Sequence, residues 1–491
     1  MKYFKYIPVI IILVLATGCK KYLAEEPTKQ ASIKTAEQLD ALMNNNNNFN
    51  NNVNNLGLNF STDDMEISPA LYSASIGLWS TDNLVHFTFD IQQLQDRPSD
   101  VFWNGEYKKI FTANIILQNV DKVEGSAALK KQLKADAHFA RAFSYWMMVN
   151  YYCLPYSIAN ENAPGLPIKR TVDYGESLVR ASLKETYTFI ESDLQEALAT
   201  DQDDVDLTKP WRVSKKAVAA FLSRLYLIKG DLVKSLEQSN LALATTKATL
   251  VDYKTLLPGT AQTFSNPAVT LNYSELNNWA AVQFLYWKEF FYTRIAYNSS
   301  QWNIPTPSLM SLYDQSNDLR FKYHFIPNSN RRFGILSPAV FRYTFFSDGR
   351  YQPIGPTISE ILLNKAEVLA RQGDITNAMA AINTLRAKRM NTVVPPVTAA
   401  TKDEAILKVL EERRREMPFA MRWFDIRRFS VNDYPADDVT VQHTFYNIIN
   451  GVPDVSTSVT FTLAPGSKRY AVPINNSEIV NSQNQIEQNK Y

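Results

Sequence analysis

A helix that ends at a Gly-Asp pair, followed by a second helix of fixed spacing, occurs twice in this sequence of 491 residues. One copy turns at Gly230-Asp231 and the other at Gly373-Asp374. Glycine readily adopts the left-handed backbone that ends a helix, and aspartate can cap the helix that follows. Small or apolar residues stand five, nine and twelve positions after each glycine: Ser235, Ser239 and Ala242, and then Ala378, Ile382 and Leu385. The pattern predicts pairs of closely packed antiparallel helices.

This spacing is typical of tetratricopeptide-type helix hairpins, in which small residues let two helices approach closely. A regular solenoid would continue the repeat without interruption, whereas these two copies are far apart in the chain. We therefore expect other structure between the hairpins. Apolar residues with helical periodicity predict further helices at 35–43, 103–120, 129–151, 183–198, 215–228 and 402–429.

The segment between the two hairpins, at about 251–350, is rich in aromatic residues. We interpret it as a loop-rich insert with short strands near 340–346. The asparagine-rich run at 44–55 is interpreted as a surface loop, because it cannot bury an apolar face. The predicted fold is mainly α. Helix hairpins around 103–245 and 357–430 pack against an irregular, loop-rich part that carries a few short strands.

The N-terminus has the composition of a secretory signal peptide. Lys2 and Lys5 precede an apolar run at 7–15, which is too short to span a bilayer. Ala16, Thr17 and Gly18 lead to Cys19, as in a bacterial lipobox, although leucine stands one place earlier than usual. We expect residues 1–18 to be removed, Cys19 to be acylated, and 19–34 to serve as anchor and tether. Two or more acyl chains are enough for stable membrane anchoring.

Charge and cysteine content exclude some classes of function. Without Lys2 and Lys5 the count of Lys and Arg falls from 51 to 49, equal to the 49 acidic residues. A near-neutral protein has no long-range field for polyphosphate, so no nucleic-acid partner is expected. Cys153 is the one cysteine besides Cys19. It cannot form an intramolecular disulfide once Cys19 is acylated, and we interpret it as a small buried side chain.

Nine aromatic residues fall between Trp279 and Trp302, inside the insert. They either form a small core beneath long loops or provide a stacking platform for a sugar ring or another planar face. Most such residues serve packing, but we expect some of them to line a site. The candidate ligand-binding residues are Trp79, Trp279, Tyr286, Trp287 and Trp302.

Catalytic and metal-binding patterns are weak in this sequence. Asp63-Asp64, near Trp79, is the acidic pair that best merits inspection for a glycoside hydrolase. A surface or calcium-like role is preferred over catalysis for this pair, and a plain structural role over both. Four histidines are isolated in the sequence, and His138 is interpreted as a core histidine. No cofactor and no metal site are expected.

Charged residues alternate in sign around Glu411–Glu416 and continue through Arg422, Asp425, Arg427 and Arg428. Offsets of three and four place opposite charges side by side on a helix. We interpret this stretch as a solvated or internally paired surface and not as a basic patch for nucleic acid.

Fragments in a fixed order resemble the SusD/RagB family. They are Cys19–Pro27, Trp103–Leu117, Ala135–Trp146 with Asn150–Pro155, Gly165–Ile168, Arg180–Leu183, Ala217–Gly230, Asp318–Arg320, Asn364–Arg386, Trp423–Phe429 and Tyr470–Ile479. The chain departs from the family pattern at Phe419–Met421 and at Lys490, which stands where proline is common. The resemblance runs from Cys19 to the C-terminus.

This resemblance implies a surface-exposed lipoprotein of the outer membrane with a SusD-like fold of four helix pairs. It further implies a non-catalytic protein that binds oligosaccharide or peptide and acts with a SusC-like, TonB-dependent barrel transporter. Residues 35–491 are expected to form one SusD-like domain. Two alternatives stay open: a helical-repeat scaffold that binds only proteins, and a glycoside hydrolase. The sequence does not name the ligand.

Overall fold

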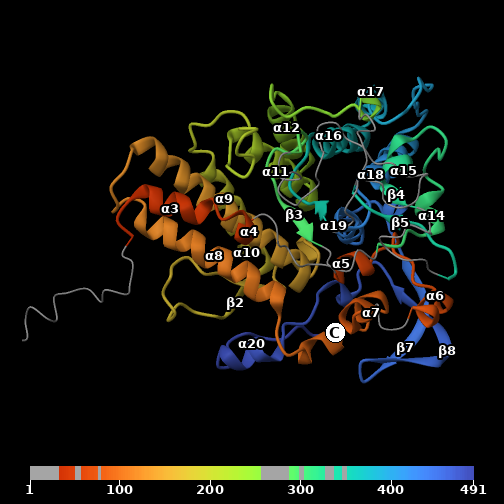
Figure 1. Ribbon diagram of the computed structural model, residues 1–491, viewed down its shortest axis with the longest axis horizontal. Helices are drawn as coiled ribbons and strands as arrows, with labels where there is room; N and C mark the ends of the chain where they lie inside the picture. Colours follow the sequence, from red (N-terminus) through yellow and green to blue (C-terminus); the bar gives the residue numbers. More distant parts are fainter. Residues whose placement is uncertain are drawn as a thin grey trace, which may run out of the picture.

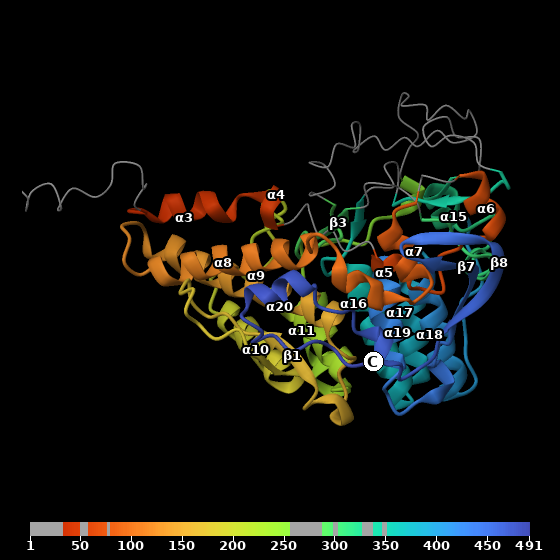
Figure 2. The ribbon, with the colours of Figure 1, turned by 90° about the horizontal axis from the view of Figure 1, so that it is seen from below.

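The computed structural model describes residues 33–49, 57–75, 79–255, 287–297, 303–326, 337–345 and 351–491. Helices dominate it, as expected. The helices of 36–43 and 101–197 lie on one side of the molecule, with the short helix of 476–481 beside them. The helices of 358–429 lie on the other side, together with the short helices of 57–87 and the paired strands β7 and β8 at the edge (Figures 1 and 2). The helices and strands carry the labels of Figure 1.

The first side is built around the long helix α9, Ala127–Tyr152, which packs against α3, α8 and α10 (Figure 2). Ser126 caps its N-terminus by accepting a hydrogen bond from the Leu129 N–H. From Leu133 onward α9 is almost entirely buried because alanine and aromatic residues occupy all its faces. Its neighbours are α3, Ala36–Met43, α8, Val101–Asn119, and α10, Leu183–Ala197.

Two helix pairs join the sides. The first consists of α11, Lys215–Lys229, and α12, Leu232–Leu243. The second consists of α16, Ile358–Gln372, and α17, Ile375–Arg386, and α12 packs on α16. The turn glycines, Gly230 and Gly373, have φ of 77° and 87°, the left-handed conformation that the pattern required. The six residues predicted to face the partner helix are all buried: Ser235, Ser239, Ala242, Ala378, Ile382 and Leu385.

The last helix pair is α18, Lys402–Glu416, and α19, Ala420–Phe429, as the sequence predicted for 402–429. Helix α18 packs on α16 and α17. Its apolar face joins α16 and α17 in a second buried cluster, to which Val409 and Leu363 belong. The larger core lies beneath α9 and α11 and includes Trp146 and Phe221.

Short elements fill the rest of the described chain. The short helices are α4, Asn46–Phe49; α5, Gly57–Phe60; α6, Pro69–Ala74; α7, Thr81–Phe87; α14, Pro307–Met310; α15, Leu319–His324; and α20, Asn476–Asn481. Antiparallel strand pairs are β1, Pro164–Pro167, with β2, Arg180–Ser182; β3, Ile295–Tyr297, with β6, Tyr351–Pro353; and β4, Phe325–Ile326, with β5, Arg342–Tyr343. Strand β5 is the element expected near 340–346. Part of the asparagine-rich run forms α4 and not a loop.

A longer hairpin near the C-terminus was not predicted. Strand β7, Val441–Ile449, pairs with β8, Val452–Leu463, and the chain turns at Asn450 and Gly451 with positive φ. Side chains of β7 alternate between buried and exposed, as in a strand with one covered face. Val441 and Phe445 are the buried members that fix this register.

Within the described part of the chain, every helix is either too short or too polar to cross a lipid bilayer.

Candidate functional site

The predicted site residues fall into two groups. Cys19, Trp279, Tyr286 and Trp302 lie outside the described residues. Trp79 and Trp287 are described, and both are buried, with 8% and 5% of their surface exposed. Contact of any of these six residues with a ligand or lipid therefore stays a prediction.

The two described tryptophans pack within the protein. The indole N–H of Trp79 donates to Ser75 Oγ at 3.0 Å, and its ring meets Phe60 edge-on at 6.5 Å. The ring of Trp287 meets Phe345 edge-on at 5.8 Å. A cavity beside Trp287 has a volume of about 20 Å³. It has room for about one water molecule and none for a sugar ring.

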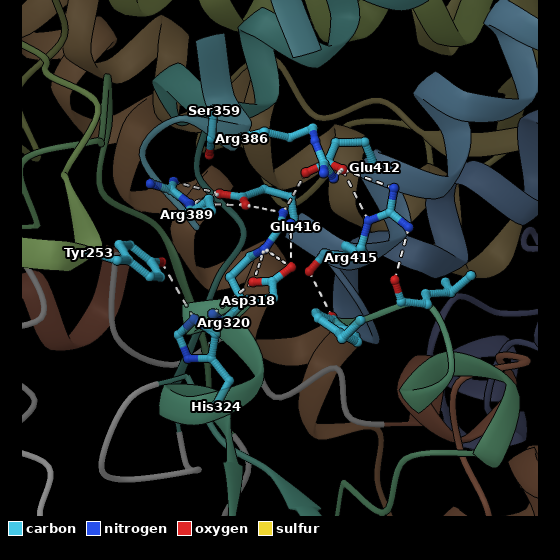
Figure 3. A network of polar contacts seen from close by, with 12 residues as sticks. Tyr253, Asp318, Arg320, His324, Ser359, Arg386, Arg389, Glu412, Arg415 and Glu416 are labelled. Atoms are coloured by element: carbon cyan, nitrogen blue, oxygen red, sulfur yellow. Dashed lines mark hydrogen bonds and ion pairs between the residues drawn. The ribbon is translucent and has the colours of Figure 1, made fainter. Parts of the chain in front are cut away.

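A buried network of charges ties the insert to the helices that follow it in the chain (Figure 3). The guanidinium of Arg389 lies between two carboxylates, 2.9 Å from Glu289 and 2.7 Å from Glu416. It also donates to the carbonyl of Val251 at 2.7 Å and lies over the ring of Tyr253, 4.2 Å from the centroid. One side chain beyond α17 thus connects the start of the insert and its segment around Glu289 to α18.

Arg320 of α15 extends the network from inside the insert. Its guanidinium lies 2.8 Å from Asp318, 2.8 Å from Glu412 and 3.0 Å from Glu416. Arg415 approaches Glu412 within 2.9 Å from the same helix. Buried charges of this kind are costly unless paired, so each contact fixes the position of the segment that carries it.

The network shifts the pKa values of its carboxyl groups. Burial alone would raise the pKa of Glu412, but the guanidinium groups of Arg320, Arg415 and Arg386 lower it to about 2. Burial raises the pKa of Glu289, and nearby Glu416 adds to this effect while Arg389 opposes it. Glu412 is therefore held as a carboxylate and is a fixed counter-charge for three arginines.

Asp63 and Asp64 have the plain structural role that was preferred over a surface or calcium-like one. Asp63 receives two hydrogen bonds from Arg422, at 2.8 and 2.9 Å. Asp64 is fully buried, pairs with Arg414 at 2.7 Å and accepts the Phe419 N–H at 2.8 Å. The two aspartates fasten the chain after α5 to α18 and to the start of α19.

Despite this role, the two aspartates have different pKa values. Burial opposes the shift of Asp63, but Arg422 and Arg414 lower its pKa to about 2, whereas burial raises the pKa of Asp64. A split of this kind is found in acid–base pairs. Here arginines and backbone groups already bind both carboxylates, so neither carboxylate is available to act on a substrate.

The mixed-sign stretch is internally paired, as one of the two interpretations predicted, and it is buried. Arg413 donates to Asp425 at 2.9 and 2.7 Å, and Arg428 donates to Glu367 at 2.5 and 2.7 Å.

A nitrogen of the His138 ring lies 2.7 Å from a carboxylate oxygen of Asp193. Among the described residues, no group of three or more His, Cys, Asp or Glu side chains could hold a metal ion.

A ligand-sized cleft lies elsewhere, between α8, the loop 167–178 and the segment around α20. Its volume is about 410 Å³. Trp103, Tyr107 and Phe111 of α8 line it, and Tyr174 stands at its mouth. These three residues lie in the helix predicted at 103–120, and their spacing of four indicates that they share one face of it. The sequence around Tyr174 carried no such signal.

A second, more open groove of about 640 Å³ runs between α7 and the turn of the β7–β8 hairpin. Its polar side chains are largely engaged by the protein. Gln93 donates to the Ile448 carbonyl at 3.1 Å, and Arg97 pairs with Asp82 at 3.3 Å and with Asp100 at 2.8 Å. Among the described residues, none of the side chains that line it is aromatic, so it is the weaker candidate for a ring-shaped ligand.

Comparison with known proteins identifies two family models in this sequence. Residues 21–227 match the model described as "Starch-binding associating with outer membrane", and residues 358–491 match the model described as "SusD family". The segment between the matches contains the insert. No curated protein matches the sequence.

Solved structures share the fold. A SusD superfamily protein from Bacteroides thetaiotaomicron is 16% identical, with a TM-score of 0.65 over 93% of this chain and 100% of that one. A SusD-like carbohydrate binding protein from Bacteroides vulgatus is 17% identical, with a TM-score of 0.62 over 92% and 97%. A laminarin binding SusD-like protein is 18% identical, with a TM-score of 0.61 over 93% and 99%.

These likenesses establish the fold, and the family follows from the two sequence matches, which lie at either end of the chain. The chain belongs to the SusD/RagB family.

Proposed function

We propose that this protein is a nutrient-binding lipoprotein of the outer membrane. It captures an oligosaccharide at the cell surface and delivers it to a SusC-like, TonB-dependent transporter. The observation that carries the proposal is the pair of family matches at 21–227 and 358–491, one of them to starch-binding proteins associated with the outer membrane. Acylated Cys19 is the proposed anchor.

Two features favour an oligosaccharide over a charged ligand. The mature chain is near neutral, and the insert is dense in aromatic residues, whose faces suit the C–H surfaces of sugar rings. A structural relative is described as laminarin binding, which makes a neutral β-glucan a sensible first probe. Peptides with aromatic side chains would also suit an aromatic platform and form the second arm of the test.

Binding without turnover is the proposed mode of action. The acidic pair considered for hydrolysis, Asp63 and Asp64, is engaged by Arg422, Arg414 and the Phe419 N–H. Glycoside hydrolysis requires two carboxyl groups that flank the scissile bond, about 5 Å or about 6.5–9.5 Å apart, and that are free to reach it. Because both aspartates are already bound by other groups of the protein, they support a binding function over hydrolysis.

The test uses purified protein that starts at residue 20, screened on glycan and peptide arrays and then by isothermal titration calorimetry. We expect saturable binding of one ligand class and no change in that ligand after prolonged incubation. Trp279→Ala and Trp302→Ala are expected to weaken binding by about 1–3 kcal/mol each, as for other aromatic anchors. Trp287→Ala, at a buried position, should instead lower the free energy of unfolding.

Three outcomes separate the candidate functions. Conversion of the bound ligand to product would identify an enzyme. Absence of binding on both arrays, together with co-purification of a barrel transporter from detergent-solubilised membranes, would identify a protein scaffold. Saturable binding without turnover, lost in the tryptophan variants, supports the nutrient-binding function.

A further inference from the structure

The cleft between α8, the loop 167–178 and the α20 segment has the dimensions of a small-molecule site. Its volume of about 410 Å³ falls in the range of ligand pockets. Trp103, Tyr107 and Phe111 recur every four residues along α8, which places them in one row on the same face of the helix. The row forms one aromatic wall of the cleft.

The opposite wall is a loop held in a defined conformation. The Glu176 carboxylate accepts the backbone N–H of Arg170 at 2.9 Å and of Thr171 at 3.2 Å. The Asn114 amide, from α8, donates to the carbonyls of Lys169 and Thr171 at 3.2 and 2.9 Å. The loop is thus braced by its own carboxylate and by the helix it faces. A loop that is already ordered before the ligand arrives loses little conformational entropy on binding.

Tyr174 stands at the mouth of this cleft and is 89% exposed. Its ring centroid lies 6.0 Å from that of Phe111, with the two planes inclined by 35°. Gly175, next to it, donates its N–H to Asp173 at 2.8 Å, which fixes the turn that carries the tyrosine. A large aromatic side chain is therefore held out into solvent beside an aromatic wall, in a position to close over a ring.

The remaining lining residues define the chemistry of the ligand. Ile110, Leu178 and Ile486 make much of the lining apolar. A sugar ring entering among them would leave hydroxyl groups without hydrogen-bond partners, at substantial cost. Charged groups of both signs also line the cleft, with Lys108 and Lys169 balanced by Asp173 and Glu478. This composition favours a neutral ligand with an apolar ring and a polar substituent.

We propose that this cleft binds an aromatic ring that carries a neutral, hydrogen-bonding substituent. The ring inserts between the α8 row and Tyr174, and its substituent meets the polar side chains of the lining. Such a ring can come from an aromatic residue of a short peptide or from the aromatic aglycone of a glycoside. No described residue of the insert lines this cleft, and α8 and α20 lie apart from α15 in both views (Figures 1 and 2).

The experiment measures binding to the protein starting at residue 20 by isothermal titration calorimetry. The probes are N-acetyltyrosine amide, for the peptide source, and p-nitrophenyl β-glucoside, for the glycoside source. Methyl β-glucoside provides the same sugar without the aromatic ring. At least one aromatic probe should bind saturably with a stoichiometry of one, while methyl β-glucoside should give no saturable heat. Which aromatic probe binds identifies the source.

Variants of Tyr174 locate the site. Tyr174→Ala should weaken binding about tenfold, which corresponds to one aromatic contact of about 1.4 kcal/mol. Tyr174→Phe keeps the ring and should retain the wild-type affinity. Ile158→Ala is the matched control, since Ile158 is similarly exposed at 87% and does not line the cleft. Because both positions are exposed, these variants should unfold at the wild-type temperature.

The proposal is overturned if neither aromatic probe binds, if methyl β-glucoside binds as tightly as the aromatic glycoside, or if Tyr174→Ala leaves the affinity unchanged. A failure here leaves the proposed nutrient binding intact, because that function is tested with separate ligands and with the tryptophans of the insert. Conversely, loss of polysaccharide binding in Trp279→Ala with unchanged binding of the aromatic probe would confirm two separate sites.

Discussion

Arg224 and Glu360 form a two-point ion pair between α11 and α16, with N–O distances of 2.7 and 2.5 Å. Both side chains are almost completely buried. A third bond from Arg224 reaches the carbonyl of Ile354 at 2.8 Å, just before α16 begins. The pair therefore joins the two helix hairpins whose glycine turns are so alike in sequence.

Removal of one partner should destabilise the protein strongly. Arg224→Ala leaves the Glu360 carboxylate buried without its cation, and we expect a loss of about 3–5 kcal/mol in the free energy of unfolding. Urea unfolding followed by circular dichroism measures this. Lys131→Ala is the control, because Lys131 forms an exposed pair with Asp201 and should change stability by less than about 1 kcal/mol. An equal loss in both variants would contradict the assignment.

Acid should weaken the network around Glu412. The pKa of Glu412 is about 2 in the folded protein, below its ordinary value of 4.5, so the folded state favours the carboxylate. The resulting stability is present above about pH 5 and is lost as the pH falls towards 2. The shift corresponds to about 3 kcal/mol. We expect Glu412→Gln to be much less stable than wild type at pH 7 and nearly equal to it at the acid end, in urea unfolding at stepped pH.

Glu411 provides a neighbouring control for this measurement. It is 55% exposed and meets Arg415 only at 3.8 Å. Glu411→Gln should follow the wild-type pH profile closely. A profile of Glu412→Gln that runs parallel to wild type from pH 7 to 3 would show that the arginines do not hold this carboxylate.

Substitution of glycine by alanine should change stability in opposite directions at a helix-ending glycine and at a glycine inside a helix. A Cβ at Gly230 or Gly373 would meet nothing within 4 Å, so the cost of Gly230→Ala comes from the positive φ alone. We expect a loss of about 1–2 kcal/mol in stability. Gly105 lies inside α8 and also has open space around its Cβ position, but no positive φ. Gly105→Ala should therefore stabilise the protein by about 0.5–1 kcal/mol, measured by the same urea titration.

Cys19→Ala should release the protein from the membrane. Without the thiol no acyl chain can be attached, and the protein should move to the soluble fraction after cell disruption. Mass spectrometry of the N-terminal peptide of the wild type should show an acylated Cys19 after removal of residues 1–18. Cys153→Ala is the control and should remain in the membrane fraction. A wild-type protein that keeps its first 18 residues would refute the anchor.

Helices with one regular apolar face were predictable from the sequence. The periodicity at 183–198 and 402–429 marked α10 and the α18–α19 pair to within a few residues. The Gly-Asp turns located both hairpins and their contact residues, because only a narrow set of backbone conformations can end one helix and start another in two residues.

The hairpin β7–β8 was missed, although Val441, His443 and Phe445 alternate with polar residues. In strand β8, Val459, Phe461 and Leu463 alternate with threonine, but the first half of the strand carries no such alternation, and most of the strand is exposed. Exposure on both sides leaves little apolar alternation to detect in such a strand.

Burial of the charged stretch could not be predicted either. The alternating charges of α18 fit an exposed helix equally well, and the partners that bury them lie far away in the chain. Asp64 and Arg320 are examples, and no sequence spacing connects them to Arg414 or Glu412. The tryptophan candidates show the same limit, since Trp79 and Trp287 became core residues through contacts that only the tertiary fold creates.

The bond between Asp64 and Arg414 spans 350 positions of the chain. A ribosome makes Asp64 early, and the cation that neutralises it arrives only with the final quarter of the polypeptide. Until then the segment after α5 holds a carboxylate that cannot leave water without severe cost. The segment after α5 can therefore take its buried position only once α18 has been made, so this part of the fold is completed late.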